Sequence, residues 1–150
     1  MISITNQPID ISKLMNDCRD ESAGATVFFS GSIRDHNEKG KVIGIYYEAY
    51  VKMAKNTLTE IESEVLKKWD VKKFVAIHRF GNLLVNEISV AVGVTTEHRQ
   101  DAFEACKYAI DSIKARTPIW KKELSESGNN TWKSGILPLN VESTLGNEDK

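Results

Sequence analysis

Several features that would place a chain in a class at once are scarce or missing from these 150 residues. The two cysteines, Cys18 and Cys106, lie far apart in the chain, so they form neither a metal-ligand pair nor a redox pair. No apolar run approaches the roughly 18 residues of a membrane span. The first ten residues hold no basic stretch followed by an apolar one, so no signal peptide is predicted. We expect a soluble, cytoplasmic protein without a membrane partner.

Neither sign of charge is in excess: 20 Lys and Arg face 21 Asp and Glu, for a net charge of −1. A general nucleic-acid-binding protein normally shows a strong basic excess, so no nucleic-acid partner is predicted. A local basic pocket for a small anion stays compatible with this balance. No glycine-rich phosphate loop, zinc-ligand spacing or Ser-His-Asp pattern occurs. We therefore expect neither a metal site nor a bound cofactor.

Hydrophobic spacing predicts two long helices, one over residues 51–69 and one from near Thr96 to Pro118. Thr96 is the expected N-cap of the second helix, and its expected inner face includes Phe103. A short helix is predicted over 10–18. Alternating and β-branched residues predict strands near 2–4, 23–35, 42–50, 71–80, 87–95 and 118–124.

The strands at 23–35 and 42–50 are expected to pair as a hairpin across a surface loop at 35–41. Gly81 and Asn82 are expected to form a turn, and the strand at 87–95 to be buried on one face only. This order predicts an α+β fold, a mixed or antiparallel sheet packed with two long helices. We expect one domain over residues 1–150, with a core at about 24–133 and a flexible tail at 136–150.

The most informative charged stretch runs from Lys107 to Lys122, with five basic residues against one acid, Asp111. Lys107, Asp111 and Lys114 share one helix face, and a solvated face is the simplest interpretation. The alternative is that Lys114, at the edge of the buried stripe, is partly desolvated and suited to proton transfer. The side chain of Lys121 should point away from those of its two neighbours, because the segment is extended.

Three other residues are candidates for binding an anion. His98 and Arg99 open the second long helix directly after a strand, where free N–H groups and the helix dipole suit a phosphate. Arg34 ends a strand beside a polar loop and could also hold an anion. An ordinary surface pair, or a salt bridge with a neighbouring acid, is the alternative in each case. A second pair, His78 and Arg79, ends a strand before a turn, and we interpret it as structural.

Five segments, in this order along the chain, resemble the large, catalytic subunit of molybdopterin synthase. They are FSGSIRDHN, YYEAYVKMA, AIHRFG, VGVTTEHRQDAF and SIKARTPIWKKE, followed by a glycine turn and Trp132. The matching segments span roughly residues 24 to 133. The resemblance implies an α/β-hammerhead-type fold, a homodimer and a sulfurtransferase of molybdenum cofactor biosynthesis.

The resemblance also implies a reaction and a partner. The family converts cyclic pyranopterin monophosphate (precursor Z) into molybdopterin by installing two sulfurs as a dithiolene. Each sulfur arrives as a thiocarboxylate at the C-terminal Gly-Gly of a small ubiquitin-like subunit, and two such subunits would complete a heterotetramer. A chain that receives sulfur from a partner needs no reactive cysteine, so Cys18 and Cys106 are expected to be structural.

Matched motif by motif, Lys114 and Lys121 are implied to be the catalytic residues. Lys114 would stand beside the thiocarboxylate and the pterin carbon under attack, for proton transfer or stabilisation of negative charge. The residues implied to bind substrate are Ser32, Ile33, Arg34, His98, Arg99, Lys122 and Glu123. In the family, the His-Arg pair reaches the site from the other copy of the dimer. The alternative function is a non-catalytic module that binds a phosphorylated small molecule.

Overall fold

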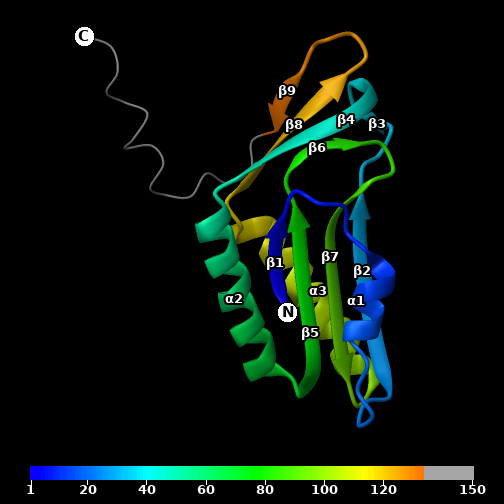
Figure 1. Ribbon diagram of the computed structural model, residues 1–150, viewed down its shortest axis with the longest axis vertical. Coiled ribbons are helices and arrows are strands. Elements are labelled where there is room, and N and C mark those ends of the chain that lie inside the picture. Colours follow the sequence, from blue (N-terminus) through cyan, green and yellow to red (C-terminus); the bar gives the residue numbers. More distant parts are fainter. Residues whose placement is uncertain (134–150) are drawn as a thin grey trace, which may run out of the picture.

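A computed structural model describes residues 1–133 of the chain (Figure 1). Its elements are β1 (Ile2–Thr5), α1 (Ile11–Asp17), β2 (Ala25–Ser32), β3 (His36–Asn37), β4 (Gly40–Ala49), α2 (Val51–Lys68), β5 (Val71–Arg79), β6 (Gly81–Leu84), β7 (Ile88–Thr96), α3 (Arg99–Arg116), β8 (Ile119–Ser125) and β9 (Thr131–Lys133). The predicted α+β class is confirmed. The expected flexible tail at 136–150 lies outside the described residues. No helix within residues 1–133 has the length and apolar character to cross a bilayer.

The strands form two sheets. The first has the order β1-β5-β7-β2, with β1 parallel to β5 and the other pairs antiparallel. The second has the order β3-β4-β8-β9, with β6 also paired to β4, and is antiparallel throughout. Figure 1 shows the second sheet above the upper ends of β5 and β2, so the two sheets meet where those strands finish.

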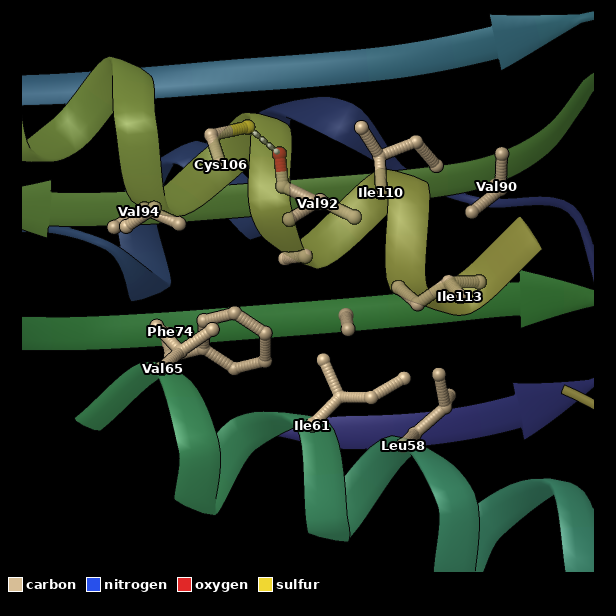
Figure 2. Packing of buried hydrophobic residues seen from close by; sticks show 13 residues of the cluster. Leu58, Ile61, Val65, Phe74, Val90, Val92, Val94, Cys106, Ile110 and Ile113 are labelled. Carbon is tan, nitrogen blue, oxygen red and sulfur yellow. Dashed lines mark hydrogen bonds between the residues drawn. The ribbon is translucent and has the colours of Figure 1, made fainter. Parts of the chain in front are cut away.

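Helices α2 and α3 cover one face of the first sheet and form the main core with it. In α2 the buried residues recur every three or four positions, which places them on a single stripe; they are Ala54, Leu58, Ile61 and Val65. In α3 the buried residues are mostly small; they are Ala102, Ala105, Cys106, Ala109, Ile110 and Ile113. Figure 2 shows the α2 side chains pointing toward β5, with the α3 residues packed beside Val90, Val92 and Val94 of β7.

The expected hairpin between residues 23–35 and 42–50 is wrong. Strand β2 pairs with β7 in the first sheet, whereas β4 pairs with β3, β6 and β8 in the second. The physical reason lies in burial: Val27 and Phe29 of β2 pack on the main core, while Val42 and Ile45 of β4 pack in a separate cluster with Leu83. Adjacency in the sequence did not decide the pairing.

Two short strands occur where loops or turns were expected. His36 and Asn37 form β3 inside the expected surface loop, and the expected turn at Gly81 and Asn82 is the start of β6. Gly81 has a φ of +93°, a conformation that side-chain-bearing residues rarely adopt, so the chain does bend there before it pairs with β4. Because these strands have only two and four residues, their alternation is too short to be recognised from the sequence.

The predicted start of the second long helix is also wrong. Thr96 is the last residue of β7, and its hydroxyl donates to the carbonyl of His98 at 2.6 Å. His98 is the N-cap of α3, and the acid of the first turn is Asp101. Phe103, expected on the inner face, is 62% exposed. The predicted end before Pro118 is confirmed, because α3 finishes at Arg116.

Strand β7 is buried on both faces rather than one. Its residues Ser89 to Thr96 are all buried. One face meets α2 and α3, and α1 covers part of the other, where a Cβ added at Gly93 would lie 2.9 Å from the thiol sulfur of Cys18. The clean alternation of valines in β7 therefore marks only one of its two buried faces, because Ala91 and Gly93 between them are small rather than polar.

Candidate functional site

A cavity of about 360 Å³ lies where the two sheets meet. Its lining residues come from β2 and the residues that follow it, from the adjoining ends of β5 and β7, from the last turn of α3, and from β4, β8 and β9 of the second sheet. The polar and apolar side chains of this lining include Ser32, Ile33, Arg34, Tyr47, His78, Ser89, Lys114, Thr117, Lys121, Glu123 and Lys133. Six of the nine predicted site residues therefore line one cavity, and both predicted catalytic lysines are among them.

The two lysines reach the cavity from adjoining elements. Lys114 stands in the last turn of α3, directly after the buried Ile113, and its side chain is exposed, with Nζ 5.7 Å from the ring centre of Phe29. Pro118 follows the end of α3 and prevents the helix from continuing. The chain then enters β8, where Lys121 lies opposite Tyr47 of β4. The seven-residue step from Lys114 to Lys121 thus spans a helix end and a strand, and it brings both amines to one space.

The environment of Lys121 shifts its amine toward the neutral form. Burial is the main cause that lowers the pKa of Lys121 from its ordinary value, and the charges of Lys114, Lys133 and Arg34 lower it further, while Glu123 opposes them. Such a lysine is a better proton acceptor near neutral pH than a solvated one. Lys121, rather than Lys114, is therefore the desolvated lysine of the pair.

Glu123 is the one carboxylate among the described lining residues. It is only 8% exposed, accepts a hydrogen bond from the side-chain amide of Asn37, and lies 3.8 Å from Nζ of Lys133. Four cationic side chains, those of Arg34, Lys114, Lys121 and Lys133, line the same cavity. The site is therefore locally basic within a chain of net charge −1, and it suits an anionic ligand.

The residues at the end of β2 divide into one buried and two exposed side chains. Ile33 is 4% exposed and is fixed by backbone hydrogen bonds, donating to Glu87 at 3.0 Å and accepting from Asn86 at 2.8 Å. Ser32 and Arg34 on either side are exposed and line the cavity. Within residues 1–133, Arg34 forms no ion pair, so the alternative of a salt bridge with a neighbouring acid is not what the structure shows.

Three predicted substrate-binding residues do not line the cavity. Lys122 points to the other face of β8, as the alternation predicts, and its Nζ lies 5.7 Å from the ring centre of Trp132. His98 and Arg99 lie at the far end of α3, exposed, beside a shallow hollow shared with Phe103. Their roles stay predictions, and within one chain they are separate from the lysines.

Several polar residues of the cavity wall, above all His78, were not predicted from the sequence. The signal was present: alternation along β5 places His78 on the same face as Phe74 and Ala76, toward the helices, at the end of the strand. The structural interpretation holds for its neighbour Arg79, which is 8% exposed and pairs with Glu87 at 3.2 Å.

The two cysteines lie in packed surroundings away from the cavity lining. Cys18 is 1% and Cys106 3% exposed, and neither is in a disulfide. Burial raises the pKa of both thiols, that of Cys106 to about 11, so the reactive thiolate is disfavoured. In the part of the chain that the structure describes, no group of three His, Cys, Asp or Glu side chains is arranged to hold a metal ion.

Known proteins are similar to this chain in sequence and in fold. The MoaE protein family matches residues 4–116. The molybdopterin synthase catalytic subunit of Thermoplasma volcanium is 40% identical over 131 residues, which are 87% of this chain and 96% of that protein. The X-ray crystal structure of molybdopterin synthase from Staphylococcus aureus superposes with a TM-score of 0.83 at 37% identity, over 87% of this chain and 95% of that one. A complex of subunits 1 and 2 of molybdopterin-converting factor from Helicobacter pylori has a chain with the same fold, with a TM-score of 0.74 at 20% identity over 96% of this chain and 97% of that one. This chain belongs to the MoaE protein family.

Proposed function

We propose that this chain is the catalytic subunit of a molybdopterin synthase, a sulfurtransferase that converts cyclic pyranopterin monophosphate into molybdopterin. The observation that carries the proposal is the meeting of Lys114 and Lys121 in one basic cavity of a MoaE-family chain. The relatives named molybdopterin synthase catalytic subunit support the same function. The reaction takes place in the cytoplasm, as part of molybdenum cofactor biosynthesis.

The cavity suits the charges of this reaction. The substrate carries a phosphate and the sulfur donor is a thiocarboxylate, so both reactants bring negative charge to a wall lined by four cations. Lys114, which is exposed, stabilises negative charge on the oxygen that leaves the pterin carbon as the thiocarboxylate sulfur bonds to that carbon. Water then cleaves the resulting thioester, which leaves sulfur on the pterin and returns the partner as a carboxylate. Lys121, whose pKa is lowered by burial, accepts or returns the proton that the step requires. Glu123 holds the side chains of Asn37 and Lys133 in position at this side of the cavity.

The sulfur donor in this proposal is a small ubiquitin-like subunit with a C-terminal Gly-Gly thiocarboxylate. Glycines have no side chains, so such a tail is narrow enough to enter a cavity of about 360 Å³ beside a substrate. A donor in trans also agrees with the two buried cysteines, which are poorly placed to carry sulfur themselves. Two copies of each subunit would form the heterotetramer.

We place the substrate phosphate at His98 and Arg99 of a second copy of this chain. His98, the N-cap of α3, stands 16 positions before Lys114, which corresponds to roughly 24 Å along a helix, and Arg99 follows it directly. A pterin monophosphate is too short to span that distance within one chain. A homodimer with a twofold axis can bring the start of one α3 to the cavity of the other copy.

Subunit complementation tests the shared site. Arg99→Ala and Lys114→Ala proteins are each expected to be inactive, and mixing them under conditions of subunit exchange should restore activity. In the mixed dimer one site has both residues intact and the other has neither. If mixed dimers form and stay inactive, the phosphate is bound within one chain and the shared site is wrong.

Mass spectrometry of the pterin tests the function itself. The chain is incubated with its thiocarboxylated partner and cyclic pyranopterin monophosphate, and the product is expected to contain two additional sulfurs. The matched control uses the same partner with an ordinary C-terminal carboxylate, which should give no product. Binding of the pterin without any conversion would overturn the proposal and indicate a non-catalytic binding module.

A further inference from the structure

Within residues 1–133, His78 has one ring nitrogen in a hydrogen bond and one without a hydrogen-bond partner. Its Nδ1 lies 2.9 Å from the carbonyl oxygen of Arg79. A carbonyl can only accept, so Nδ1 carries the hydrogen and donates it, which fixes the tautomer and leaves a lone pair on Nε2. The ring also packs edge-on against Tyr47, with ring centres 5.4 Å apart and planes at 73°. The imidazole is therefore held in one orientation at the cavity wall.

The surroundings keep this imidazole neutral. Burial lowers the pKa of His78 to about 4, and the positive charge of Lys114 acts in the same direction, against the hydrogen bond to Arg79. The charged groups that line the cavity with His78 are Arg34, Lys114, Lys121, Glu123 and Lys133, four cations against one anion. At neutral pH, Nε2 is thus an acceptor without a proton.

Apart from hydroxyl groups and His36, which is exposed and pairs with Asp35, free acceptors are few among the described side chains of the cavity. The cations only donate, and Glu123 is already engaged by Asn37 and Lys133. The hydroxyl of Ser89 donates to the carbonyl of Gly31 at 3.1 Å. Thr117 offers a buried hydroxyl oxygen that has no hydrogen-bond partner within residues 1–133, so this wall holds more than one polar atom awaiting a ligand.

We propose that His78 is a further substrate-binding residue of this site, whose Nε2 accepts a hydrogen bond from an N–H group of the bound pterin. The inference rests on the proposed function, which supplies the substrate. A reduced pterin carries several N–H donors, and the four cations of the wall offer them no acceptor. His78 thereby orients the ring, whereas the cations hold the anionic groups. It is a binding residue and takes no part in proton transfer.

Two substitutions separate this role from a structural one. In His78→Asn the side-chain amide can still donate to the Arg79 carbonyl, as Nδ1 does, but the acceptor facing the cavity is lost. In His78→Gln the longer side chain can place its amide oxygen near the position of Nε2, while the Nδ1 donor is lost. A structural role predicts the larger defect in His78→Gln, and a binding role predicts it in His78→Asn.

The experiment measures turnover with the thiocarboxylated partner and, separately, equilibrium binding of cyclic pyranopterin monophosphate to each protein. We expect His78→Asn to raise KM and Kd for the pterin at least tenfold with kcat changed less than threefold, and His78→Gln to stay within threefold of the wild type. Equal binding by all three proteins, or a defect as large in His78→Gln as in His78→Asn, would overturn the inference. A wild-type chain that neither binds nor converts the pterin would overturn the proposed function, and this inference with it.

Discussion

The two sheets of this molecule do different work. The first sheet and its helices α2 and α3 enclose a core of aliphatic and small side chains, with Leu58, Ile61, Val92 and Val94 at most 1% exposed. The second sheet has a much smaller apolar cluster and turns Lys121 and Glu123 toward the cavity. Stability therefore resides mainly in the first layer and chemistry at its junction with the second. Changes in the apolar core of the first layer should leave activity nearly intact, and changes of exposed residues at the junction should leave stability nearly intact.

The largest effect is expected from Lys114→Ala, which should reduce dithiolene formation at least a hundredfold. The side chain is exposed, so its removal should change the free energy of unfolding by no more than about 0.5 kcal/mol. Lys107→Ala is the matched control: Lys107 is also exposed on α3 but pairs with Asp111 outside the cavity, and its loss should leave turnover unchanged. Turnover assays and urea unfolding check both. Near-normal turnover by Lys114→Ala would remove this lysine from the mechanism.

The converse is expected in the apolar core between the first sheet and its helices. Ile61→Ala removes a fully buried side chain between α2 and the sheet and should cost about 2–5 kcal/mol of unfolding free energy. Leu66→Ala, on the same helix but 49% exposed, should stay within about 0.5 kcal/mol. Both proteins should keep wild-type kcat at a temperature where they are folded. A selective loss of kcat in folded Ile61→Ala would show that the layers are not separable.

Acid should lower the free energy of unfolding because His78, at the junction of the two sheets, is buried as a neutral imidazole. The pKa of His78 is about 4 in the folded chain and about 6.5 in the unfolded chain. Between these pH values the imidazole is protonated in the unfolded chain and neutral in the folded chain, so acid favours unfolding. Stability should thus fall as the pH drops from about 6.5 to about 4, by roughly 3 kcal/mol in total. Glu64, with a pKa of about 2 because of Arg116 and Tyr108, adds a separate loss at lower pH. In His78→Gln the slope of unfolding free energy between pH 6.5 and 4 should shrink; an unchanged slope would contradict the assignment.

The smallest effect on activity is expected from the double variant Cys18→Ser/Cys106→Ala. Both thiols are buried with raised pKa values, and the proposed sulfur donor is the partner. Turnover should stay within twofold of the wild type, with a stability loss of about 1 kcal/mol from the packing around Cys106. A folded double variant that no longer transfers sulfur would show that sulfur passes through this chain.

The elements that pack on the main core could be predicted from the sequence, whereas the short strands of the second sheet could not. The α2 stripe and the alternating valines of β7 are long, regular patterns, and both elements were predicted because packing against one core imposes one period. Strands β3 and β6 were missed because they are short and because their pairing with β4 depends on a tertiary arrangement. The hairpin between β2 and β4 was wrongly predicted for the same reason.

The site shows a similar limit. Lys114, Lys121 and Arg34 were identified from their segments and do meet in one cavity. His78 and Thr117 were missed as cavity residues. Alternation along β5 indicates the face of the sheet on which His78 lies, but it does not indicate that the end of β5 and the end of α3 meet the second sheet. The distance from His98 to the cavity, by contrast, follows from helix geometry alone. What a second copy contributes depends on contacts that one chain does not contain.

The most direct test of the account is a crystal structure of this chain with cyclic pyranopterin monophosphate bound. The account predicts the pterin in the cavity between Lys114, Lys121 and Arg34, with an N–H group directed to Nε2 of His78. It also predicts His98 and Arg99 of a second copy at the phosphate. A pterin bound at the hollow beside Phe103 of a single chain, with the lysine cavity empty, would contradict it.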